Sequence, residues 1–136
     1  MDVKTSRPAD REEIQRIGTA VVEAAVRVHR ELGPGLLESA YQACLIHELR
    51  ESGVVAREEV ALPVTYRGEQ IDAGYRIDLL VEERVIVENK AVDLLLPIHM
   101  AQLLTYLKLS GCRLGYLLNW NVPLMKNGIK RMVNGL

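Results

Sequence analysis

The stretch Tyr75–Lys90 of the 136-residue chain is largely apolar, but it contains the charged residues Asp78, Glu88 and Lys90. Its other charges are Arg76, at its start, and residues 82–84, which fall in the expected turn. The stretch is rich in Val, Ile and Leu and predicts two β-strands joined by a tight turn. Burying carboxylates and an ammonium on such strands is costly unless the charges serve a purpose. Two carboxylates on neighbouring strands can share a divalent cation such as Mg²⁺ or Mn²⁺, and a nearby lysine can stabilise the charge that develops on a phosphate.

This chemistry makes a geometric demand on the hairpin. Alternation along a strand places Glu88 and Lys90 on one face. A two-residue loop would set Asp78 opposite Val87, whereas a three-residue loop over residues 82–84 sets Asp78 directly opposite Glu88. A metal site therefore predicts a three-residue or bulged turn. The alternative is an ion pair on a solvated sheet face, because an isolated D-x9-E-x-K match is weak.

Glu38 and Tyr41 lie three residues apart and therefore on one face of the helix that we expect from about Leu37 to Ser52. The apolar stripe expected for this helix includes Leu37 and Tyr41. Glu38 could be a ligand of the site. It could equally be an acid that interacts favourably with the dipole at the start of its helix.

Gln102 and Tyr106 share one face of a helix expected from Ile98 to about Leu109, with His99 one turn before Gln102. A glutamine on an apolar helix can orient water or a phosphate oxygen, or it can be an ordinary surface residue. His99 alone is typical of a polar residue at a helix start.

The remaining charged candidates are simpler. His29 and His47 have no partner at ligand spacing. Lys126, Lys130 and Arg131 form a basic tail that could touch phosphates, although such a tail is usually solvated.

The bulk composition limits the class of protein. A length of 136 residues and an apolar fraction of 49% fit one globular domain, and a net charge of −1 provides no global attraction for nucleic acid. Cys44 and Cys112 are expected to be buried thiols and not a disulfide. No signal peptide or membrane span is recognisable, so a cytoplasmic protein with no membrane partner is expected.

The predicted elements suggest a mixed sheet with helices packed on it, in the order α-α-β-β-β-α-β. In chain order they are a loose arm (1–9), a helix capped by Asp10 and ending near Leu32, a helix over 37–52, a strand over 58–66 with Pro63 at an edge or bulge, a turn over 67–70, the hairpin described above, a helix over 98–109, a buried strand over 113–120 and a short strand within 126–131.

Several motifs, in order, resemble the GxxExxY family of small prokaryotic proteins. The naming signature is Gly35-Leu-Leu-Glu38-Ser-Ala-Tyr41. The accompanying motifs are Val28-His-Arg-Glu-Leu-Gly-Pro-Gly35, Ile77-Asp-Leu-Leu-Val81, Val87-Glu-Asn-Lys90, Ala101-Gln-Leu-Leu-Thr-Tyr-Leu107 and Leu114-Gly-Tyr-Leu-Leu-Asn119. The resemblance extends from about Ile14 to Val133.

That family is grouped with the PD-(D/E)XK nuclease-like superfamily. The resemblance implies an α/β, restriction-endonuclease-like core, α-β-β-β-α-β, around a mixed central sheet in a single domain. It implies that Asp78 and Glu88 bind the metal and take part in catalysis, that Lys90 is the catalytic lysine and that Glu38 is an additional metal-binding acid.

The same resemblance implies roles for helix residues beside the cleft. Gln102 is expected to act in catalysis and substrate binding, together with Tyr41 and Tyr106 as substrate-binding residues. Asn89 stands where related sequences often carry an apolar residue. It is expected to point away from the site, with little consequence for the chemistry.

Two functions remain open. The first is a Mg²⁺- or Mn²⁺-dependent nuclease acting on DNA or RNA. The second is a non-catalytic binding or assembly module that keeps the fold, since members of a superfamily can differ in function. A homodimer is compatible with either function, because a small nuclease-like unit needs a second copy to cut two strands.

Overall fold

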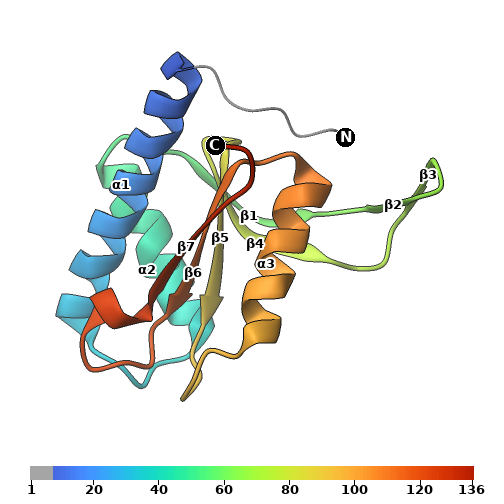
Figure 1. Cartoon of the computed structure of the whole chain (residues 1–136). Coiled ribbons are helices and arrows are strands. Elements are labelled where there is room, and N and C mark those ends of the chain that lie inside the picture. The colour runs from blue at the N-terminus through green and yellow to red at the C-terminus, as the bar shows by residue number, and fades with distance from the viewer. Residues whose placement is uncertain (1–7) are drawn as a thin grey trace.

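The computed structural model describes residues 8–136 and consists of one mixed sheet between helices (Figure 1). Its elements in chain order are α1 Pro8–Leu32, α2 Glu38–Glu51, β1 Ala56–Ala61, β2 Val64–Tyr66, β3 Glu69–Ile71, β4 Arg76–Val81, β5 Val85–Lys90, α3 Pro97–Ser110, β6 Leu114–Asn119, the 3-10 helix η1 Met125–Gly128 and β7 Ile129–Val133. The predicted element order is confirmed, with a small extra hairpin, β2–β3. The architecture is that of a restriction-endonuclease-like α/β fold.

The central sheet has five strands in the order β1-β4-β5-β6-β7. Strands β5 and β6 are parallel, and the other neighbouring pairs are antiparallel. A parallel pair requires a crossover connection, which α3 supplies. The carboxyl ends of β5 and β6 therefore lie side by side.

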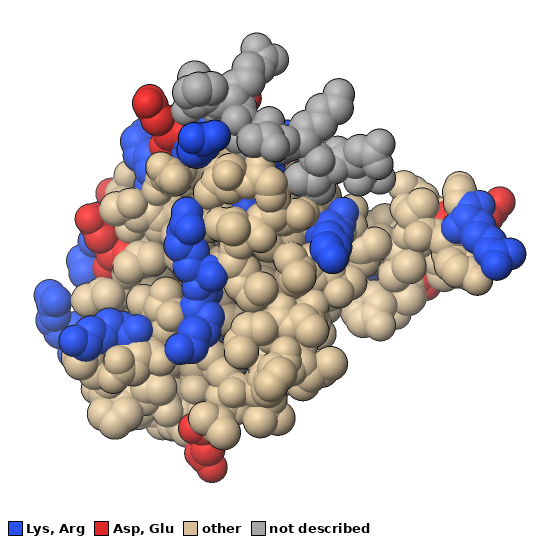
Figure 2. All heavy atoms as spheres, in the orientation of Figure 1, with Lys and Arg blue, Asp and Glu red and all other residues tan. Residues whose placement is uncertain are grey.

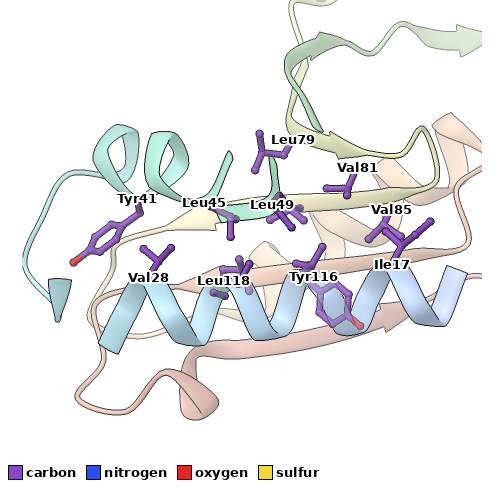
Figure 3. Packing of buried hydrophobic residues seen from close by; sticks show 14 of the residues in the cluster. Ile17, Val28, Tyr41, Leu45, Leu49, Leu79, Val81, Val85, Tyr116 and Leu118 are labelled. Carbon is purple, nitrogen blue, oxygen red and sulfur yellow. The ribbon is translucent and has the colours of Figure 1, made fainter. Parts of the chain in front are cut away.

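Helices cover both faces of the sheet, as alternation along its strands requires. Figure 3 shows one buried cluster, to which α1 contributes Ile17, α2 contributes Leu45 and β5 contributes Val85. On the other face, Leu107 of α3 packs with Ile86 of β5. Consecutive residues of β5 thus belong to clusters on opposite faces of the sheet, and helices pack against both faces.

Two glycines allow helices to approach β6, whose residues are all buried. A Cβ at Gly18 in α1 would lie 2.6 Å from the hydroxyl oxygen of Tyr116 and 2.8 Å from a methyl carbon of Leu114. A Cβ at Gly115 would lie 3.0 and 3.1 Å from leucine methyl carbons of α3. These close approaches fix the separation between the helices and the sheet.

The first helix begins earlier than predicted. It starts at Pro8, so Asp10 lies inside its first turn and the prediction that Asp10 is the N-cap is wrong. Proline suits the first turn of a helix because its φ is already helical and its missing N–H needs no partner there. Of the loose N-terminal segment predicted over residues 1–9, residues 1–7 lie outside the described residues, whereas Pro8 and Ala9 belong to the helix.

The other helices agree with prediction within a residue or two. Gly33 follows α1 with a φ of 67°, and Gly111 ends α3 with a φ of 79°. Leu37, however, was predicted to lie in the buried stripe of α2. It is 77% exposed, because it occupies the N-cap position in front of the helix.

The predicted strand over residues 58–66 is divided into β1 and β2. The N–H of Leu62 still donates to the carbonyl of Tyr75, at 3.0 Å. Pro63 has no N–H with which to continue the ladder. The chain then leaves the sheet and forms the separate hairpin β2–β3, which projects from the body (Figure 1). We refer to this hairpin, Val64–Ile71, as the arm.

The turn of the arm is shorter than the predicted span of residues 67–70. Arg67 and Gly68 alone connect the strands, with φ values of 50° and 82°. Positive φ at both central residues is typical of two-residue hairpin turns. Glu69 and Gln70 consequently belong to β3.

Cys44 and Cys112 are free thiols, as predicted, although both are half-buried and not fully buried. Within residues 8–136 no helix is long and apolar enough to span a membrane.

Candidate metal and catalytic site

The β4–β5 hairpin has the turn length that a shared acid site demands. Val81 pairs with Val85 and Leu79 pairs with Val87, so residues 82–84 form a three-residue loop. The N–H of Arg84 donates to the carbonyl of Val81 at 3.0 Å and closes this loop. Continuing the register places position 78 opposite position 88. The predicted turn length is therefore confirmed.

At this position, side chains replace the backbone ladder between the strands. The N–H of Asp78 donates to Oε2 of Glu88 at 2.7 Å, and the N–H of Asn89 donates to Oδ2 of Asp78 at 2.8 Å. Each carboxylate is thus fixed by a backbone N–H of the opposite strand. The result is a closely spaced carboxylate pair at the point where β4 and β5 separate.

Both acids of the pair resist ionisation. Glu88 is only 4% exposed. Burial, and next the negative charge of Asp78, raise the pKa of Glu88 to about 8, although the Asp78 N–H and the charge of Lys90 act in the opposite direction. Burial also raises the pKa of Asp78 above its ordinary value. Glu88 is buried and Asp78 is half-buried, and the charge of Asp78 disfavours ionisation of Glu88. Such a carboxylate pair forms a donor set that a divalent cation would stabilise.

Lys90 lies two residues after Glu88 and projects on the same face of β5. It is half-buried, and its side chain lines a groove between α3 and the base of the arm. The other residues that line this groove include Val64, Tyr75, His99, Gln102 and Tyr106. The structure therefore brings Lys90 together with two of the predicted helix residues.

Gln102 and Tyr106 interact with each other beside the groove. Nε2 of Gln102 donates to the hydroxyl of Tyr106 at 3.3 Å. Burial, and next the charge of Glu88, raise the pKa of Tyr106, which indicates that its hydroxyl lies near the acid pair. Tyr75, which the sequence did not single out, packs edge-on against Tyr106 with ring centroids 6.0 Å apart. The side chain of His99 accepts the N–H of Leu96 at 3.0 Å and thereby stabilises the start of α3.

Glu38 connects the first turn of α2 to the end of β5. Its Oε1 accepts the N–H of Ala91, immediately after Lys90, at 3.1 Å. Its negative charge contributes to the raised pKa of Asp78. Among residues 8–136, however, no three His, Cys, Asp or Glu side chains are arranged to hold a metal ion. Direct ligation by Glu38 therefore stays a prediction.

Tyr41 does not lie at a surface that a substrate could reach. Its side chain is fully buried and stacks on Trp120, with ring centroids 4.7 Å apart and planes 3° from parallel. Its hydroxyl donates to the carbonyl of Gly33 at 2.5 Å and accepts the N–H of Leu36 at 3.1 Å. The structure gives Tyr41 a different role from the predicted substrate contact: it holds the loop that leads to Glu38.

A chain of amide hydrogen bonds lies behind the site, and its only trace in the sequence is a lone asparagine on an apolar strand. Asn89 points away from the groove, as predicted, into the cluster beneath α1 and α2. Nε1 of Trp120 donates to its Oδ1 at 2.9 Å, and its Nδ2 donates to Oε1 of Gln42 at 3.2 Å. Because an indole can only donate, Trp120 fixes the orientation of both amides. The Nε2 of Gln42 then donates to Glu59 at 3.1 Å.

Glu59 is an acid that sequence reasoning missed. Its φ is 52°, although Glu58 and Val60 on either side pair regularly with β4. The same register places it across from Asp78, and its negative charge contributes to the raised pKa of both Asp78 and Glu88. No local sequence pattern indicates this position, because Glu59 lies across from Asp78 only when β1 pairs with β4.

The other two histidines lie away from the pair. His29 is buried, and its Nε2 lies 2.8 Å from the carbonyl oxygen of Val122. His47 is exposed on α2, with Nε2 3.8 Å from Glu51. Their omission from the candidate site agrees with this placement.

Comparisons with known proteins bear on the family. A family model described as the PD-(D/E)XK nuclease superfamily matches residues 15–132, which is most of the chain. No curated protein and no solved structure matches the chain. The match does not distinguish the GxxExxY family within the superfamily. The matched region contains the carboxylate pair, the adjacent lysine, the mixed sheet and the crossover helix, and the chain therefore belongs to the PD-(D/E)XK nuclease superfamily.

Proposed function

We propose that this protein is a divalent-metal-dependent nuclease that hydrolyses phosphodiester bonds in DNA or RNA. The observation that carries the proposal is the Asp78–Glu88 pair, in which a half-buried and a buried carboxylate are each held by a backbone N–H of the opposite strand, with Lys90 on the same face as Glu88. Such a pair is unfavourable by itself and suited to a bound cation. Membership in the PD-(D/E)XK superfamily supports the same class of reaction.

In this proposal Asp78 and Glu88 hold the cation, which is Mg²⁺ or Mn²⁺. When bound, the cation supplies Lewis acidity towards a phosphate oxygen and makes water easier to deprotonate. Lys90 projects into the groove beside the pair. Its ammonium would stabilise the additional negative charge that a phosphate acquires as it is attacked.

The remaining groove residues would position the substrate and water. Gln102 lines the groove, and its amide nitrogen donates to Tyr106. Its amide oxygen is therefore the atom that would orient an attacking water. Glu38 anchors the backbone immediately after Lys90. A change at Glu38 would therefore move Lys90 even if Glu38 does not touch the metal.

A cleavage assay tests the proposed reaction. Wild-type protein is incubated with plasmid DNA, single-stranded DNA and RNA, with Mg²⁺, with Mn²⁺ or with EDTA. We expect cleavage that requires a divalent cation and that Lys90→Ala abolishes. Lys108→Ala is the matched control, because Lys108 is an exposed lysine on α3 that does not line the groove. Unchanged cleavage by folded Lys90→Ala would remove Lys90 from the mechanism.

Metal binding is tested independently of turnover. Mn²⁺ is titrated calorimetrically into the wild type and into an Asp78→Ala, Glu88→Ala double variant whose folding is confirmed by circular dichroism. Saturable binding that is lost in the double variant supports the site. Absence of both metal binding and cleavage in the folded wild type would favour the non-catalytic module. The homodimer stays a prediction, which light scattering after size exclusion tests.

A further inference from the structure

The two edge strands of the sheet differ in charge. At one edge, β1 carries Glu58 and Glu59, and its Arg57 is paired with Glu83 at 2.6 Å. At the opposite edge, η1 and β7 carry three cations and no acid. The nearly neutral net charge of the chain therefore conceals a separation of charge across the sheet.

The cations at the second edge are Lys126, Lys130 and Arg131, and Arg30 at the end of α1 lies near Lys126. All four are exposed, and none forms an ion pair or hydrogen bond with another residue of the described chain. Arg30 and Lys126 line a common hollow between α1 and η1. In Figure 2, Lys and Arg side chains gather over β7 and η1, and acidic side chains are seen only at the margins of this face.

We propose that this basic edge, made of Arg30, Lys126, Lys130 and Arg131, binds the phosphate backbone of the nucleic acid that the Asp78–Glu88 site cleaves. The inference rests on the proposed function and extends it to the surface that holds the substrate. Phosphate neutralisation by Lys and Arg supplies most of the sequence-independent affinity for nucleic acid. A protein with a net charge of −1 needs such a local surface.

The sheet register connects the basic edge to the acid pair. Glu88 pairs with Leu117, and Leu117 pairs with Lys130, so the three positions form one row across the sheet, on the face that α3 covers. Leu117, in the middle of the row, is buried beneath α3. Arg131 pairs with Tyr116 and therefore projects on the other face, towards α1. Neighbouring strands are about 4.8 Å apart, which puts the backbone of Lys130 about 10 Å from that of Glu88. One strand of a duplex carries a phosphate every 3.4 Å or so of helix axis. Because α3 covers the row, a nucleic acid cleaved beside Glu88 would pass around α3 to bring its more distant phosphates to Lys130.

The alternative explanation is that charges on β7 protect an exposed edge strand from pairing with another chain. That explanation accounts for Lys130 and Arg131. It does not account for Arg30 and Lys126, which lie outside the strand. It also predicts no salt-dependent binding of nucleic acid.

Fluorescence anisotropy separates these explanations. Fluorescein-labelled duplex and single-stranded DNA are titrated with protein in EDTA, at a series of salt concentrations. The test variant is Lys126→Gln, Lys130→Gln, Arg131→Gln. The matched control is Arg16→Gln, Arg50→Gln, Arg57→Gln, which changes the net charge equally at exposed positions on α1, α2 and β1. Circular dichroism verifies that both variants are folded.

We expect wild type and control to bind with the same steep dependence on salt. The test variant should bind more weakly, and its slope of log K against log salt should be smaller by about 2 to 3, since each lost duplex phosphate contact removes about 0.9. A slope equal to that of the control would overturn the inference, and so would a wild type that binds no DNA at any salt concentration. The separate cleavage assay decides the nuclease activity, so the activity can stand when the basic edge does not.

Discussion

The acid pair makes a prediction about stability that requires no knowledge of the substrate. The folded state raises the pKa of Glu88 from the ordinary 4.5 to about 8. Folding therefore favours the protonated acid. The stability that this preference provides is fully present below pH 4.5 or so, and it is lost as the pH rises through the folded-state pKa of about 8. Glu88→Gln is neutral at every pH and keeps an oxygen to accept the Asp78 N–H. It should therefore remove the contribution of this group to the pH dependence of stability.

The size of the effect follows from the linkage. One unit of pKa difference corresponds to about 1.4 kcal/mol, so the metal-free wild type should lose about 3 kcal/mol of unfolding free energy between pH 4.5 and pH 7 through this group. The loss should level off at about 4 to 5 kcal/mol above pH 8, by the same linkage. Asp78, whose pKa is also raised, acts in the same direction.

Urea unfolding in EDTA from pH 5 to pH 8.5 measures this dependence. We expect the unfolding free energy of Glu88→Gln to equal that of the wild type at the acid end and to exceed it by about 3 kcal/mol near pH 7.5. Glu69→Gln, which removes an exposed carboxylate on the arm, is the control. Its unfolding free energy should change with pH as that of the wild type does. Parallel curves for wild type and Glu88→Gln across this range would refute the argument that burial and the charge of Asp78 hold Glu88 protonated.

Three further predictions concern the metal and the packing. A saturating concentration of Mn²⁺, about a hundred times the dissociation constant, should raise the unfolding free energy of the wild type by about 2.7 kcal/mol. An equal increase in the Asp78→Ala, Glu88→Ala variant would show that the cation binds elsewhere. Gly18→Ala should lower the unfolding free energy by about 1 to 3 kcal/mol, because the new Cβ would lie 2.6 Å from the Tyr116 hydroxyl. This loss should outweigh the higher helix propensity of alanine. A higher urea midpoint for the variant would contradict the close packing of α1 on β6. Asn89→Leu should lower the unfolding free energy by about 1 to 3 kcal/mol, because it leaves the buried indole N–H of Trp120 without an acceptor. A double-mutant cycle with Trp120→Phe should show that the two effects are coupled. Additive effects would argue against a hydrogen bond between these side chains.

Much of the fold and of the candidate site could be predicted because the relevant signals are local. The alternation of Val, Ile and Leu predicts the β4–β5 hairpin, and its spacing predicts the three-residue turn that sets Asp78 beside Glu88. Side chains in a strand repeat every two residues, so the face of Lys90 followed as well. The start of α1 was less predictable, because Asp10 and Pro8 both fit the beginning of a helix.

By itself, therefore, the sequence determined which residues are candidates for the chemistry and how those on one hairpin face each other. Only the tertiary structure decided which distant residues support them: Trp120 packs over Tyr41 and turns it away from any substrate, Asn89 and Gln42 link two elements behind the acids, and β1 brings Glu59 across from Asp78. These contacts join residues far apart in the chain. Helical and strand periodicities describe only neighbours along the chain, whereas the pairing of strands and the seating of helices depend on how the whole core packs.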